Sequence, residues 1–344
     1  MYITEITQLK AACLHHIGSK AIEEGVTLSH QVLELDEVST KNLYTYCFSS
    51  FKNDEKYVFY NQLSLEYNET MACIKQIFAD KESLLEQSRN LARLLYDKSE
   101  HPGIKSGDLI VAYFADCEID GYITDAIGLY KCENTTNFLS LNYQGNNAGI
   151  TSLEGLDLKC VDKAALIFNV DGEQGYSLAV IDNNNKGEAK YWVEDFLQAK
   201  PKADEYYHTR ALLSVAKNFI KNSVPEEVTK GEKAELMDKT LRYFQKNDTF
   251  DMDDFSSKVM GDEQLSSDFG AYMRSFMEKN DIEMPKQFSI SESAVKKSSR
   301  SMKSVIKLDK NFHIYVHGGE GLIKKGYDPE TGMAFYQLFF KDEE

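Results

Sequence analysis

The chain has 344 residues, of which 42% are apolar, 27% charged and 12% aromatic, and its 55 acidic and 39 basic side chains give a formal net charge of −16. With 5 Pro and 20 Gly, this composition excludes a disordered or fibrous protein. The negative charge excludes a protein that coats nucleic acid over its whole surface, so any contact with phosphates requires a local basic patch.

The first half of the chain predicts a mixed α and β arrangement. A short strand is expected at 31–35, a helix at 39–51 and a longer amphipathic helix at 69–96, where apolar residues recur every three or four positions. Short β-type runs separated by turn-forming residues follow at 108–115, 119–131, 138–143, 161–170 and 176–182. Because no helix-length segment lies between these runs, they predict an antiparallel sheet.

The polar stretch 199–204 is the expected boundary between two domains, 1–200 and 201–344. After it, periodic apolar residues predict helices at 204–221, 230–245, 253–259 and 268–279. The β pattern returns at 288–290, and three further runs resemble a small terminal antiparallel sheet, at 304–308, 312–316 and 333–340. The fold class is therefore α+β: an N-terminal mixed domain with helices packed on a largely antiparallel sheet, followed by a helical region and a small C-terminal antiparallel sheet.

The usual signatures of catalysis and cofactor binding are missing from the sequence. It has no GxxxxGK(S/T), GxGxxG, HExxH or GxSxG motif, and its six cysteines form no CxxC pair that could hold zinc. The amino terminus lacks the apolar segment of a secretory signal, and no apolar run is long enough to span a bilayer. We therefore expect a cytosolic protein that catalyses no reaction and uses no cofactor, no metal and no membrane.

Two groups of polar residues have both a functional and a structural interpretation. His15 and His16 are neighbours in a predicted helix or turn and point in different directions, which favours structural or surface histidines over ligands. Asp182, Glu188 and Lys190 resemble the acidic pair plus lysine with which metal-dependent nucleases hold Mg²⁺. The segment between them is more typical of a hairpin.

Charge is segregated along the second half of the chain. Residues 286–325 hold nine bases and three acids, whereas residues 248–283 hold ten acids and three bases. The basic segment is rich in Ser, and hydroxyls and long cations can bind phosphate oxygens without reading bases. The candidate DNA-binding residues are Lys296, Lys297, Arg300, Lys303, Lys307, Lys310, Lys324 and Lys325. The alternative is a solvated basic loop that docks against acidic helices of its own chain or of a partner subunit.

Several segments resemble those of a known family in patterns that reflect the fold and not catalysis. They are 14–20 with 28–29, 91–96, 107–111, 158–167 and 191–197. Over about residues 1–340, the chain resembles the bacterial nucleoid-associated proteins often called NdpA-like. The resemblance implies a place in the cytoplasmic nucleoid, association with DNA and no known enzymatic reaction. It also implies that a DNA topoisomerase is a candidate partner.

The sequence leaves two main functions open. In the first, a homodimer binds double-stranded DNA without sequence specificity through the basic segment, and two patches act together. In the second, the protein is an adaptor that binds a DNA-handling enzyme such as a topoisomerase through apolar or acidic surface, for example in 248–283, and does not contact DNA. A divergent metal-dependent nuclease is a third, weaker hypothesis.

Overall fold

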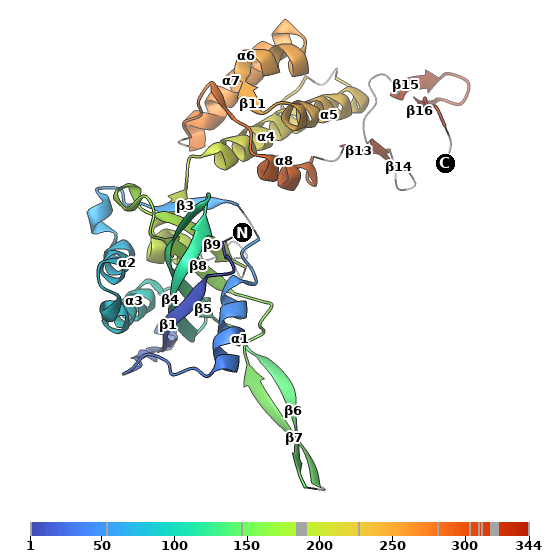
Figure 1. Ribbon diagram of the computed structural model, residues 1–344. Helices are drawn as coiled ribbons and strands as arrows, with labels where there is room; N and C mark the ends of the chain where they lie inside the picture. Colours follow the sequence, from blue (N-terminus) through green and yellow to red (C-terminus); the bar gives the residue numbers. More distant parts are fainter. Residues whose placement is uncertain are drawn as a thin grey trace. The chain divides into compact units, whose positions relative to one another are not determined.

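The computed structural model describes residues 2–52, 54–145, 147–183, 191–225, 228–280, 282–302, 304–308, 310, 312–316 and 323–342. The chain divides into two compact units, Met1–Lys202 and Ala203–Glu344 (Figure 1). In the part of the chain so described, no helix is long and apolar enough to cross a membrane. The α+β class predicted from the sequence is confirmed, with a large sheet in the first half and helices in the second.

The first unit is built on one eight-stranded sheet. Its strands, in the order in which they pair, are β10 (Ala199–Pro201), β3 (Lys56–Phe59), β9 (Ser177–Asp182), β8 (Lys163–Phe168), β5 (Tyr122–Cys132), β4 (Gly107–Ile119), β1 (Gln8–Ile17) and β2 (Val26–Thr27). Every neighbouring pair is antiparallel, as the short turns between the β-type runs predict.

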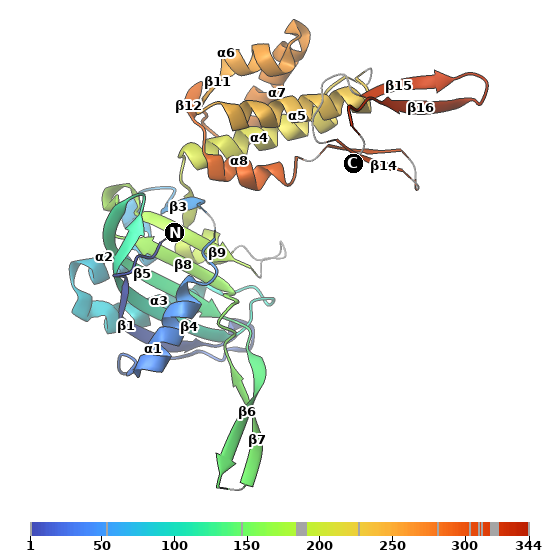
Figure 2. The ribbon, with the colours of Figure 1, turned by 45° about the vertical axis from the view of Figure 1, so that its right-hand side comes forward.

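Helices cover both faces of this sheet. Helices α2 (Glu69–Ala79) and α3 (Leu84–Lys98) lie on one face, and α1 (Glu37–Phe48) lies on the other (Figures 1 and 2). Strand β4 shows why both faces are apolar. Leu109, Val111 and Tyr113 join the core beneath α2 and α3, while Ile110, Ala112 and Phe114 join the core beneath α1. Alternate residues of a strand point to opposite faces, so a strand covered on both sides must be apolar throughout.

Short helical segments complete the first unit. They are η1 (Lys20–Ile22), η2 (Leu65–Tyr67), η3 (Lys81–Ser83), η4 (Gly172–Gln174) and the π-helical segment η5 (Tyr191–Leu197). The single helix predicted at 69–96 is wrong, because α2 ends at Ala79 and Asp80 is extended. The Asp80 side chain accepts a hydrogen bond from the Glu82 amide at 3.1 Å, which starts a new turn instead of continuing the old one.

Two further predictions for the first unit are corrected. Residues 31–35 form no strand; they run as a loop that the Leu33 amide ties to the Ala12 carbonyl at 2.8 Å. His15 and His16, predicted in a helix or turn, lie in strand β1. The sequence hides the alternation of β1 because the polar His15 is buried and the apolar Leu14 is exposed.

Strands β6 (Thr136–Gln144) and β7 (Asn147–Gly155) form a separate two-stranded ribbon in the first unit. In Figures 1 and 2 this ribbon projects from the body of that unit. The sequence predicts most of β6 and the turn after it. It does not predict β7, whose Gly149, Ser152 and Gly155 are poor strand formers.

The second unit contains α4 (Glu205–Asn222), α5 (Lys230–Lys246), α6 (Met252–Phe255), the π-helical η6 (Ser256–Met260), α7 (Glu263–Asn280) and α8 (Glu292–Ser299). A short ladder joins β11 (Thr249–Asp251) to β12 (Gln287–Ser289). The core of this unit is strongly aromatic and includes Phe219, Phe244, Phe250, Phe255 and Phe269.

The carboxyl-terminal β structure consists of two separate antiparallel ladders. One pairs β13 (Ser304–Lys307) with β14 (His313–Val316), and the other pairs β15 (Ile323–Asp328) with β16 (Met333–Leu338). The turn after Asp328 joins β15 to β16. Strand β15 is absent from the sequence prediction because Lys324, Lys325 and Gly326 carry no β signal.

Candidate nucleic-acid interface

Helix α8 carries the first part of the basic segment and is firmly attached to its unit. The Ser291 hydroxyl accepts a hydrogen bond from the Ala294 amide at 3.4 Å, and the Ser291 amide donates to the Thr209 hydroxyl of α4 at 3.0 Å. Ala294 and Val295 are buried, and Met302 is buried just after the helix. The start of the segment is therefore an anchored helix and not the solvated loop of the alternative interpretation.

Three of the predicted cations lie together at the end of α8. Lys296 and Lys297 are in its last turn, Arg300 follows directly, and all three are exposed. Arg300 is four residues after Lys296 and three after Lys297, so its side chain is a neighbour of each of the two lysines on the helix surface. A structural role explains the same charges, since cations stabilise the negative end of a helix dipole.

Four of the remaining predicted residues lie beyond α8, in the carboxyl-terminal β structure. Lys307 ends β13 opposite His313, and Lys310 is exposed between β13 and β14. Lys324 and Lys325 are neighbours in β15, so their side chains leave opposite faces of the ladder, and the Lys324 ammonium lies 5.5 Å from the ring centre of Phe339. Lys303 lies outside the described residues.

The acidic side chains at the start of α6 have local structural roles. The Asp251 carboxylate accepts a hydrogen bond from the Asp254 amide at 2.9 Å, and this bond lowers the Asp251 pKa. Asp254 pairs with Lys258 at 2.9 Å and accepts a hydrogen bond from the Tyr243 hydroxyl at 3.0 Å. The hydrogen bond from Lys258 is the largest cause of the lowered pKa of the Asp254 carboxyl. These contacts support the start of the helix.

His15 is structural. Its Nε2 atom and the Ser88 hydroxyl of α3 are 2.8 Å apart, and its Nδ1 atom accepts the Ser29 amide at 3.1 Å. Burial, with Arg89 and Arg93 nearby, lowers the His15 pKa to about 4, so the ring is neutral near pH 7. The neighbouring His16 points to the other face and contacts Asp108 at 2.8 Å.

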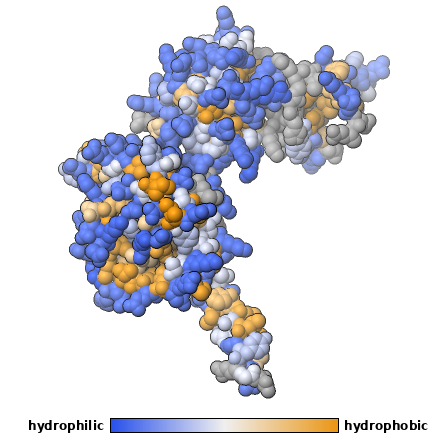
Figure 3. Space-filling model, viewed as in Figure 1, coloured by the Kyte–Doolittle hydropathy of each residue, from blue (hydrophilic) through white to orange (hydrophobic). Residues whose placement is uncertain are grey.

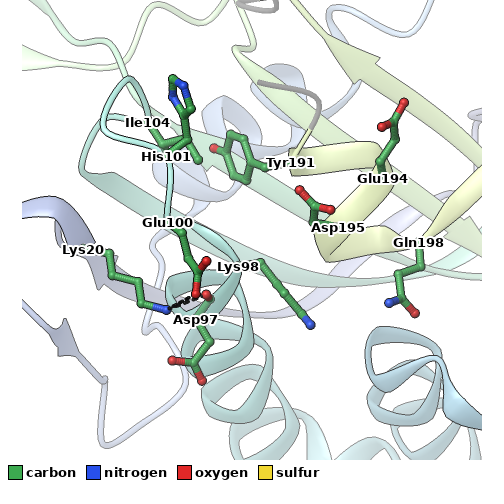
Figure 4. A pocket seen from close by; sticks show the side chains of 10 residues that line it. All are labelled: Lys20, Asp97, Lys98, Glu100, His101, Ile104, Tyr191, Glu194, Asp195 and Gln198. Carbon is green, nitrogen blue, oxygen red and sulfur yellow. Dashed lines mark hydrogen bonds and ion pairs between the residues drawn. The ribbon is translucent and has the colours of Figure 1, made fainter. Parts of the chain in front are cut away.

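The first unit has a cleft of about 720 Å³ with mixed charge (Figure 4). It is lined by Lys20, Asp97, Lys98, Glu100, His101, Ile104, Tyr191, Glu194, Asp195 and Gln198. In Figure 4 the Lys20 ammonium points toward Glu100, and the two are 3.2 Å apart. Four carboxylate residues against two lysines make this cleft a poor site for a polyanion.

Of the three residues in the nuclease hypothesis, Asp182 has a structural role in the first unit. Asp182 pairs with the Lys163 ammonium at 2.7 Å, and both side chains are almost fully buried. Glu188 and Lys190 lie outside the described residues. Among the His, Cys, Asp and Glu residues that the structure does describe, no group of three is arranged to hold a metal ion.

Comparison with known proteins yields one family. A family model described as nucleoid-associated protein YejK matches residues 14–333. No curated protein matches the chain.

Proposed function

Since the chain belongs to the family of nucleoid-associated protein YejK, we propose that it is a non-enzymatic protein of the cytoplasmic nucleoid that binds double-stranded DNA. The contact is made to phosphates, so it is largely independent of base sequence. The binding form is a homodimer, in which each copy contributes one basic patch and the second contact gains from the high effective concentration.

The observation that supports this proposal most directly is the cluster of Lys296, Lys297 and Arg300 at the end of α8. Long cationic side chains on one exposed helix turn can approach successive phosphates, and α8 itself is held by Ala294 and Val295. The remaining lysines of the basic segment, Lys303, Lys307, Lys310, Lys324 and Lys325, stay in the proposal as secondary contacts.

The test replaces Lys296, Lys297 and Arg300 together by Gln and measures binding to a duplex at salt concentrations from about 50 to about 200 mM. Each lost phosphate contact lowers the salt slope by about 0.9, so a decrease of about 2–3 per site is expected. A matched control replaces the exposed Lys41, Lys52 and Lys75 of the first unit by Gln, which gives the same net charge. Equal slopes for the two variants would exclude α8 as the contact.

A second candidate function is that of an adaptor for a DNA-handling enzyme such as a topoisomerase. It is favoured by a groove of about 380 Å³ at the end of α7, lined by Arg274, Met277, Glu278, Ile282, Glu283 and Met284. The mixture of apolar and acidic side chains suits a protein partner better than a polyanion. If the pure chain fails to bind duplex even at about 50 mM salt, this function is favoured over direct DNA contact.

A further inference from the structure

The β6–β7 ribbon exposes an unusual amount of apolar surface. Leu139, Leu141, Tyr143 and Ile150 are between 64% and 74% exposed, and Figure 3 shows orange, hydrophobic residues along the ribbon. Large apolar side chains gathered on one thin element are typical of an interaction surface and not of a solvated loop.

The strand register places these four side chains on one face. Leu141 is directly opposite Ile150, Leu139 opposite Ser152 and Tyr143 opposite Ala148, so all of them share a face of the ribbon. The pairs between them, Ser140 with Thr151 and Asn142 with Gly149, lie on the other face, which also carries the half-exposed apolar pair of Phe138 and Leu153 near the base of the ribbon. The ribbon therefore has one side that is apolar along its length and a second side that has large apolar side chains only near its base.

The ribbon also has few of the features that keep a free β edge soluble. Between Thr136 and Leu153 it carries no Asp, Glu, Lys, Arg or Pro, in a chain that is 27% charged. Within the described residues, β6 and β7 pair only with each other. A two-stranded ribbon is marginally stable alone in water, and contact with further protein stabilises it.

We infer that the apolar face of the β6–β7 ribbon binds the same face of a second copy of this chain. A polyanion finds no cation on the ribbon, and a charged protein partner finds no complementary charge before Glu154. An uncharged apolar face is complementary to itself, as an interface with two-fold symmetry requires. Two copies of net charge −16 repel each other, and this repulsion is smallest where neither surface is charged.

The available area is sufficient for a stable dimer. A large apolar side chain that is about two-thirds exposed leaves roughly 90 Å² for a partner to cover, so two ribbons offer about 700 Å² of apolar area. At the roughly 65% apolar fraction of homodimer interfaces, this corresponds to about 1,100 Å² in total, which exceeds the approximate threshold of 1,000 Å² for a specific interface.

The test measures the mass of the full chain by light scattering, without DNA. The wild type is expected at about twice 39.2 kDa, and the variant Leu139→Thr/Leu141→Thr/Ile150→Thr at the mass of one chain at the same concentration. Threonine keeps the preference for strands while removing most of the apolar surface. The control Ser140→Thr/Thr151→Ser exchanges two residues on the opposite face and should keep the mass of two chains.

A second measurement covers the case in which the triple variant does not fold. A photo-reactive benzophenone amino acid in place of Tyr143 should cross-link two chains upon irradiation, whereas the same group in place of Thr151 should not. A wild type with the mass of one chain, a triple variant with the mass of two, or a mass that rises beyond two chains would overturn the inference, because a symmetric pair of ribbons closes at two.

This inference rests on the proposed function only in that two copies act together. The inference and the proposed function can fail separately, because the mass without DNA tests the ribbon and the salt slope with DNA tests α8.

Discussion

At the scale of single residues, His15 links the stability of the first unit to pH. The buried neutral ring accepts the Ser29 amide through Nδ1 and has a pKa of about 4 in the folded chain, below its ordinary value of 6.5. Between these two values the unfolded chain binds the proton more readily, so this contribution to stability is present above about pH 6.5 and is lost as the pH falls toward 4.

We therefore expect His15→Gln to reduce the loss of unfolding free energy between pH 7 and pH 5 by about 1–2 kcal/mol relative to the wild type. Urea unfolding at the two pH values measures this difference. His30 is exposed, and His30→Gln serves as the control that keeps the wild-type pH dependence. An undiminished pH dependence in His15→Gln would show that the ring is not the titrating group.

At the scale of single elements, the start of α5 depends on one reciprocal pair of hydrogen bonds. The Thr229 hydroxyl accepts the Glu232 amide at 3.2 Å, and the Glu232 carboxylate accepts the Thr229 amide at 2.7 Å. Thr229→Ala should lower the unfolding free energy of the second unit by about 1 kcal/mol. The Glu232 amide loses its acceptor, and the Glu232 carboxylate is no longer held in place beside the backbone amide of residue 229. Thr229→Ser keeps both bonds and should change the urea midpoint little. Equal midpoints for the two variants would contradict this role.

The same scale shows what the sequence could and could not predict. The runs that form β4, β5 and β8 are long, apolar and bounded by turns, so the antiparallel sheet follows from them. The sequence does not predict strand β1 or helix α8, and the reason differs between the two. The alternation of β1 is masked because the apolar Leu14 is exposed and the polar His15 is buried, whereas α8 has only Ala294 and Val295 as apolar positions in eight residues. The charge count identified Lys296, Lys297 and Arg300. Their grouping on one helix turn required the fold, because α8 is stabilised by burial against α4.

At the scale of the whole molecule, each unit has its own hydrophobic core. The cores of the first unit include Leu91 of α3 with Trp192 on one face of the sheet, and Phe114 with Tyr130 on the face covered by α1. The core of the second unit is rich in phenylalanine. A unit with its own core is expected to unfold as a separate cooperative transition. The two proposed contacts also lie in different units, the ribbon in 1–202 and α8 in 203–344.

The pieces 1–202 and 203–344, produced separately, should therefore each give one cooperative unfolding transition. The first piece is expected to form a pair, with twice the mass of one copy of 1–202, and not to bind duplex. The second is expected to have the mass of one chain and to bind duplex with the salt slope of a single α8 patch, but more weakly than the full chain, which gains from two linked patches. Calorimetry, light scattering and a salt-titrated binding assay measure these properties. If the second piece binds as tightly as the full chain, pairing through the ribbon contributes nothing to DNA binding, and the two units act independently in function as well as in folding.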